Sequence, residues 1–213
     1  MIKKHETIRK IVDKGIVAVL RSETEEKAMK VANACLKGGV NIIEITFSVP
    51  HADKVISALK DKLKGIDVVL GAGTVVDAIT ARIAILAGAE FIVAPTFDKD
   101  VAIICNIYGI PYMPGCMTVN EMKEAIKYGV DIIKLFPADQ FSSKYIKNIK
   151  APLPQVNIMV TGGVNVKNTQ EWIRNGAVAV GVGGNLTTVI NDDYDSIEKV
   201  AAEYIEQVKL GRE

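Results

Sequence analysis

Short apolar runs alternate with longer amphipathic stretches along the whole chain. Most runs are rich in Val and Ile and apolar on both faces, which is typical of strands in a parallel sheet covered on both sides. They occupy residues 16–20, 41–47, 67–70, 91–94, 111–113, 131–136, 156–160 and 178–182. The stretches between them have helical spacing, and one stripe is formed by Ala28, Val31, Ala32, Cys35 and Leu36.

Glycine stands just before six of these strands, where a left-handed residue ends a helix: Gly39, Gly65, Gly88, Gly109, Gly129 and Gly176. Eight strand–helix units follow one another without a linker, which predicts an α/β fold: a single (β/α)8 TIM barrel of eight parallel strands. The predicted domain spans residues 1–213, with an N-terminal helix over 1–14. The rival doubly wound sheet lacks its dinucleotide fingerprint, because Val76 and Leu186 stand where the third glycine belongs.

Composition excludes several classes of partner. Lys and Arg number 26 against 25 Asp and Glu, so the net charge of +1 gives no reason to expect nucleic acid or a membrane surface. The apolar run 15–20 is too short for a signal peptide, and no run approaches the ~20 residues of a membrane span. We therefore expect a cytoplasmic protein.

The Cys and His content argues against a metal centre or a disulfide framework. The three cysteines, Cys35, Cys105 and Cys116, are odd in number and have no C-x-x-C spacing, which suits a reducing compartment. Only two histidines occur, His5 and His51, too few for a His-rich metal site. We expect no metal and no cofactor.

Lys134 is the most informative candidate residue. Barrel enzymes carry their active residues at the C-terminal ends of strands, and Lys134 lies late in the run DIIKLF, on the same face as Ile132 and Phe136. An apolar setting disfavours the ammonium form, lowers the pKa and frees the amine as a nucleophile. The chemistry that a free amine offers is a Schiff base with a ketone.

Glu44 is the matching carboxylate, in the run IIEIT on the same face as Ile42 and Thr46. Burial raises the pKa of a carboxyl group and suits it to general acid–base catalysis. In a barrel the two strands lie opposite each other, so both side chains could face a central substrate. The alternative is that Glu44 and Lys134 form a buried ion pair.

Two glycine loops supply a candidate anion site. Gly162 and Gly163 follow the seventh predicted strand, and Gly183 and Gly184 follow the eighth. Backbone amides and a short helix N-terminus at these two strand ends commonly bind phosphate in barrels. Glycines also serve tight turns, but the two loops together favour a phosphorylated substrate.

Three further residues at strand ends are candidates for substrate binding. Arg21 could hold a carboxylate at two points, or be a surface arginine before a helix that begins near Thr24. Thr74 could donate to the same carboxylate, or cap the helix after it. Pro95 could shape the pocket wall, or serve only a turn.

The motifs GGVNIIEIT, GAGTV, FIVAP, MPG, IIKLFPA and TGGVN occur in this order. In order and spacing they resemble the 2-keto-3-deoxy-6-phosphogluconate (KDPG) and 4-hydroxy-2-oxoglutarate (KHG) aldolases. The resemblance implies a metal-independent class I aldolase, typically a homotrimer that works in Entner–Doudoroff-type sugar-acid breakdown. It implies that Lys134 is the Schiff-base lysine and Glu44 the general acid/base. It also implies that Thr74, Pro95 and Thr161 line a keto-acid pocket. The two phosphate loops that it implies contain Gly162 and Gly163, and Gly183 and Gly184.

The chain departs from the family pattern at three positions. Ser48 stands where many members have an arginine that grips the substrate carboxylate, and we expect Arg21 to replace it. Gly184 stands where many have a serine, which removes one donor from the phosphate loop. Val160 stands where a proline often precedes the threonine.

The sequence thus predicts cleavage of KDPG to pyruvate and glyceraldehyde 3-phosphate, with KHG as a possible second substrate. The expected partner is a small 2-keto acid, and the two glycine loops favour a phosphorylated one. Two other classes stay open: a barrel isomerase or decarboxylase that binds phosphate without covalent chemistry, and a catalytically silent oligomeric scaffold.

Overall fold

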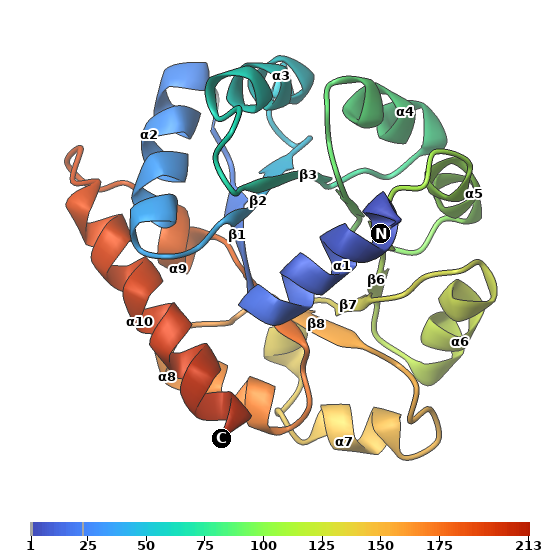
Figure 1. The fold of residues 1–213 in the computed structure, drawn as a ribbon. Coiled ribbons are helices and arrows are strands. Elements are labelled where there is room, and N and C mark those ends of the chain that lie inside the picture. Colours follow the sequence, from blue (N-terminus) through green and yellow to red (C-terminus); the bar gives the residue numbers. More distant parts are fainter. Residues whose placement is uncertain (1, 23) are drawn as a thin grey trace.

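A ring of parallel strands surrounded by helices forms the protein (Figure 1). The computed structural model describes residues 2–22 and 24–213. The strands in this part of the chain are β1 (Ile16–Leu20), β2 (Ile42–Thr46), β3 (Val69–Gly73), β4 (Ile92–Val93), β5 (Tyr112–Met113), β6 (Gly115–Cys116), β7 (Ile133–Leu135), β8 (Ile158–Thr161) and β9 (Ala179–Val182).

All neighbouring strands pair in parallel, in the order β5-β4-β3-β2-β1-β9-β8-β7-β6. The two ends of this order are β5 and β6, which are consecutive pieces of one chain segment. Gly115 N–H donates to the carbonyl of Ala94 (2.9 Å) on one side, and Lys134 N–H donates to the carbonyl of Pro114 (2.9 Å) on the other. The sheet therefore curls into a nearly closed barrel.

The predicted count of eight strands is wrong, because the described residues form nine. The difference lies in the fifth predicted strand, which continues past Met113 but is divided at Pro114. Proline has no N–H to donate to a ladder, so regular pairing stops there. β5 pairs with β4, whereas β6 pairs with β7.

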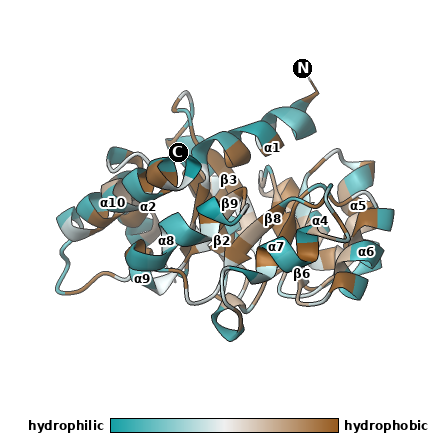
Figure 2. Cartoon of the chain, turned by 90° about the horizontal axis from the view of Figure 1, so that it is seen from below, coloured by the Kyte–Doolittle hydropathy of each residue, from teal (hydrophilic) through white to brown (hydrophobic). Residues whose placement is uncertain are grey.

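Helices follow the strands and form the outer layer. They are α2 (Glu25–Lys37), α3 (Ala52–Lys62), α4 (Ala78–Leu86), α5 (Lys99–Ile107), α6 (Val119–Lys127), α7 (Tyr145–Lys150), α8 (Val166–Arg174), α9 (Gly184–Thr187) and α10 (Asp195–Arg212), with a short 3-10 helix, η1 (Ala138–Gln140). In the segment where an N-terminal helix is predicted, α1 (Lys3–Lys14) crosses one end of the ring (Figures 1 and 2). Met1, also part of that prediction, lies outside the described residues. No helix in the described ranges is long and apolar enough to cross a bilayer.

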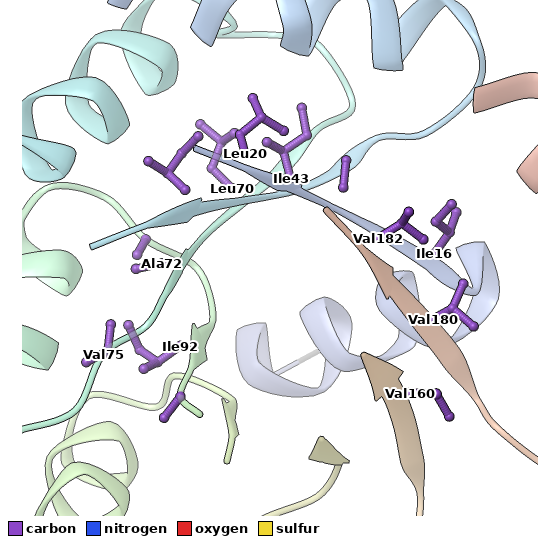
Figure 3. Close-up of a cluster of buried hydrophobic side chains, with 14 of the residues drawn as sticks. Ile16, Leu20, Ile43, Leu70, Ala72, Val75, Ile92, Val160, Val180 and Val182 are labelled. Atoms are coloured by element: carbon purple, nitrogen blue, oxygen red, sulfur yellow. The ribbon is translucent and has the colours of Figure 1, made fainter. Parts of the chain in front are cut away.

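Alternation along the strands creates two separate cores. Side chains such as Leu20, Ile43 and Leu70 point outward and pack beneath the helices (Figure 3). Inward-facing side chains, together with Ile11 of α1, fill the N-terminal half of the barrel. Hydrophobic strands thus lie in the centre, between helices whose outer faces are largely hydrophilic (Figure 2). Because α1 closes the N-terminal end, the open end of the barrel is the one at which the strands finish.

Local sequence signals explain where the helices begin and end. Thr24 caps α2, Asp77 caps α4 and Asp98 caps α5, each by accepting a hydrogen bond from a backbone N–H three residues ahead. Gly39 (φ 93°) and Gly129 (φ 78°) have the left-handed conformation predicted for the residues that turn the chain back toward the sheet.

Candidate active site

A cavity of about 460 Å³ lies at the C-terminal ends of the strands. Its wall is formed by Val19, Arg21, Glu44, Thr46, Ser48, Thr74, Pro95, Lys134, Phe136, Thr161, Gly162, Gly163, Val164, Gly181, Gly183, Gly184 and Asn185. All ten residues predicted to bind or transform substrate are among them. Positions spread over more than 160 residues of sequence therefore meet in one place.

Lys134 projects from β7 into this cavity. Its side chain is only 6% exposed, and its Nζ lies 4.7 Å from the centre of the Phe136 ring. Burial lowers the pKa of the amine; Arg21 acts in the same direction, while the negative charge of Glu44 opposes them. The surroundings therefore favour the neutral amine that a nucleophile requires.

Glu44 projects from β2 and is 1% exposed. Its Oε2 is buried without a hydrogen-bond partner. Burial raises the pKa of this carboxyl group, and the positive charges of Lys134 and Arg21 partly oppose the rise. Gly73 makes room for it, because a Cβ at that position would overlap the Glu44 carboxylate.

Glu44 and Lys134 do not form the buried ion pair given as an alternative above. Within the described part of the chain, the salt bridges involve other residues. Each of the two groups feels the charge of the other, but neither satisfies it by direct contact. An unpartnered carboxylate oxygen on a cavity wall is available to a bound molecule.

Thr161 and Thr74 present polar groups around the same cavity. The Thr161 hydroxyl is buried without a hydrogen-bond partner. A Cβ at Gly181 would overlap this hydroxyl, so no side chain fits at position 181. Thr74 has φ 59°, a strained value for a β-branched residue and one that clusters at functional sites. The alternative that Thr74 caps the following helix is wrong, because Asp77 occupies that position.

The two glycine loops lie together at one end of the cavity wall. Gly162 (φ 95°) and Gly163 (φ 71°) have successive left-handed conformations, which allow their amides to approach a ligand closely. In the described residues, the N–H groups of Gly163, Gly184 and Asn185 donate to no other backbone group. Free amides in this arrangement are suited to an anion.

Arg21 is an exposed residue on the cavity wall beside the second loop. A Cβ built on Gly183 would lie 3.3 Å from Nη1 of Arg21, so the guanidinium adjoins this loop. Pro95 lies on the cavity wall, and its carbonyl packs so closely on Gly115 that a Cβ at Gly115 would overlap it. The helix expected to begin near Thr24 is α2, which begins at Glu25 with Thr24 as its N-cap.

Sequence reasoning gave no role to Asn185, Val164 or Gly181. Strand alternation places Gly181 two residues before Gly183 on the inward face, which is a signal that could have been used. Asn185 and Val164 have no such signal, because loop conformation alone turns them toward the cavity. Among residues 2–22 and 24–213, no three His, Cys, Asp or Glu side chains gather as metal ligands would.

The cavity of this parallel barrel holds a desolvated amine and a desolvated carboxylate beside free backbone amides. These features define a class of barrel enzymes that are equipped to form a Schiff base with an anionic keto substrate. Comparison with known proteins gives the particular family. Residues 7–200 match the family model for KDPG and KHG aldolase, and the chain belongs to this family.

Curated relatives and a solved structure agree with this assignment. The 2-dehydro-3-deoxy-phosphogluconate aldolase of Treponema pallidum is 33% identical over 74% of this chain and 75% of its own. The 2-dehydro-3-deoxy-6-phosphogalactonate aldolase of Escherichia coli is 31% identical over 93% and 95%. The KDPG aldolase of Legionella pneumophila, solved with pyruvate captured as a covalent carbinolamine, superposes with a TM-score of 0.78 at 27% identity, over 93% of this chain and 94% of that one.

Proposed function

We propose that this protein is a class I aldolase that cleaves KDPG to pyruvate and glyceraldehyde 3-phosphate, and that also accepts KHG. The observation that carries the proposal is the Lys134 amine, which is 6% exposed on the wall of the substrate-sized cavity and forms no ion pair with the residues that the structure describes. An amine with a depressed pKa in such a site is poised to attack a ketone.

The first half of the reaction forms the covalent intermediate. The neutral amine of Lys134 attacks C2 of the 2-keto acid and gives a carbinolamine. The C2 oxygen takes up a proton from solvent and leaves as water, which gives an iminium ion whose positive charge makes it an electron sink. The Phe136 ring, 4.7 Å from Nζ, provides a face that is favourable for a cation.

The second half breaks the carbon–carbon bond. Glu44, directly or through a water molecule, removes the proton of the C4 hydroxyl. The C3–C4 bond breaks, its electron pair flows to the iminium, and the aldehyde leaves. The resulting enamine takes up a proton at C3, and water then hydrolyses the iminium to release pyruvate and the free amine. The raised pKa of Glu44 suits it to both accepting and returning a proton.

Substrate positioning follows from the polar groups on the wall. The free amides of the two glycine loops support a phosphate site at this end of the cavity. Arg21, which lies on the same wall, would hold the substrate carboxylate. The unpartnered hydroxyl of Thr161 supports a contact with the substrate chain. Thr74 and Pro95 would then line the end of the cavity that receives the keto-acid group.

Borohydride reduction in the presence of pyruvate tests the Schiff base. The expected result is a single pyruvyl adduct on the peptide that contains Lys134, absent from Lys134→Met. Lys150, which donates to the carbonyl of Gly176 away from the cavity, provides the matched control in Lys150→Met. A folded wild-type protein that forms no adduct, while still turning over a phosphorylated substrate, would instead support the non-covalent isomerase or decarboxylase.

Two further measurements address the remaining alternatives. A coupled lactate dehydrogenase assay with KDPG, its galactonate epimer and KHG identifies the preferred aldehyde, and absence of pyruvate from all three would leave the silent scaffold. Activity that survives EDTA is expected for a class I enzyme, whereas strong inhibition would contradict it.

We also propose a homotrimer, for which the number of subunits comes from the family resemblance. An apolar surface on two adjacent helices supports association: Ile79 (76% exposed), Ile83 and Leu86 (68%) on α4, with Ile103 and Ile107 on α5. Ile79→Asp should reduce the mass measured by analytical ultracentrifugation, with Ile190→Asp, at another exposed position, as control.

We further propose that residues 1–213 form one domain and that the protein works in the cytoplasm. The continuous sheet supports the first point. The three cysteines, all buried free thiols, support a reducing compartment.

A further inference from the structure

A side-chain amide ties the two glycine loops together at one end of the cavity. Nδ2 of Asn185 donates to the carbonyl of Val164 at 2.8 Å. Val164 follows β8 and Asn185 follows β9, so this hydrogen bond joins two loops separated by 21 residues of sequence. Both residues line the cavity.

A second asparagine restrains the neighbouring peptide group. Nδ2 of Asn168 donates to the carbonyl of Gly163 at 3.0 Å. In a trans peptide the carbonyl and the next N–H point in opposite directions, so the N–H of Val164 is turned away from Asn168. In the described residues this N–H has no acceptor. Two consecutive carbonyls of the first loop, those of Gly163 and Val164, therefore accept hydrogen bonds from side-chain amides. The N–H groups of the same two residues have no backbone acceptor in the described part of the chain.

We propose that Asn185 is a positioning residue for the phosphoryl group of the substrate: it fixes the separation of the two loops whose amides bind that group. This inference rests on the proposed function. Gly162 and Gly163 have no side chains to restrain them, and ordering such a loop on binding costs affinity unless the fold has already ordered it. Gly184 contributes no side-chain donor, so the placement of the backbone amides matters more here.

Two variants remove the donor in different ways. Asn185→Ala shortens the side chain, and Asn185→Leu keeps its approximate volume. Losing one hydrogen bond of this kind should raise the KM for KDPG about fivefold, with kcat within about twofold of wild type. The constants for KHG, which has no phosphate, should not change. The control is Asn175→Ala, which removes an amide bonded to Ser143 and Glu171 outside the cavity.

A binding measurement separates this inference from the proposed function. Titration calorimetry with glycerol 3-phosphate as the probe should show about fivefold weaker binding to both Asn185 variants than to wild type or Asn175→Ala. If wild type cleaves neither substrate but this difference holds, the aldolase proposal fails and the positioning role stands. Unchanged KM for KDPG and unchanged probe affinity in both variants would overturn the positioning role. So would equal losses for KDPG and KHG, which indicate a general disturbance of the site.

Discussion

A methyl group at Gly73 should displace the proposed acid–base residue. Gly73 ends β3, opposite Thr46 of β2 in the ladder. A Cβ built on it would overlap Oε1 and Cδ of Glu44 and lie 2.7 Å from Cγ. Carbon atoms in contact require about 3.5–4.0 Å, so Cγ of Glu44 would have to move by about 1 Å and its carboxylate by more. Because Glu44 is 1% exposed, there is little free space on the protein side to receive it.

Gly73→Ala should therefore lower kcat about 100-fold, the effect typical of a 1 Å displacement of a catalytic group. Overpacking should also lower the free energy of unfolding by about 1–3 kcal/mol. For a chain of this length, each kcal/mol corresponds to a Tm shift of about 2–4 °C. The pyruvyl adduct on Lys134 should still form, since the clash involves the carboxylate rather than the amine.

Gly71→Ala is the matched control. Gly71 lies two residues earlier on the same face of β3, and a Cβ there would overlap the ring of Phe91 in the barrel interior. This variant should lose similar stability but retain activity within about threefold of wild type, because the atoms nearest to its Cβ belong to the Phe91 ring, whereas the Glu44 carboxylate lies against Gly73. The assays are pyruvate release coupled to lactate dehydrogenase and thermal unfolding. Equal losses of activity in the two variants would refute the reasoning.

Four further predictions concern the charges of the site. Lys134→Met should abolish cleavage yet raise the free energy of unfolding near neutral pH, since the folded pKa of the lysine lies below its ordinary 10.5. Unfolding of the wild type then takes up a proton at Lys134, so the stability gained by the variant should shrink as pH rises toward 10.5. Denaturant titrations at several pH values measure this gain, and a gain that grew with pH would contradict the prediction. Glu44→Gln should also raise the free energy of unfolding near neutral pH, because the folded pKa of the Glu44 carboxyl group lies above its ordinary 4.5. This gain in stability should disappear as pH falls below 4.5. Arg21→Ala should raise the pKa of Lys134 and move the acid limb of kcat/KM to higher pH, and a limb that moves the other way would oppose the assignment. Adding Ser48→Arg to Arg21→Ala should restore the KM for the keto acid if Arg21 takes the place of the family arginine; no recovery would argue against that substitution of roles.

The composition of the cavity wall could be predicted because strand alternation is a local property. Alternation puts Lys134 on the same face of its strand as Ile132 and Phe136. It puts Glu44 on the same face as Ile42 and Thr46. Barrels present their strand ends on one side, so ten positions could be assigned to one site before any coordinates. Helix caps such as Thr24 are equally local.

The remaining features depend on contacts between distant segments. The division of the fifth strand at Pro114 becomes visible only when its two halves pair with β4 and β7. The separation of Glu44 from Lys134, which leaves two unpaired groups instead of a salt bridge, is set by the width of the barrel. The hydrogen bond from Asn185 to Val164 exists because the chain returns beside the same loop after a whole helix. Sequence determines which face of a strand a residue occupies, because that follows from the two-residue period of the backbone. Only the barrel decides how far apart side chains on opposite strands lie, because that distance depends on packing around the entire ring.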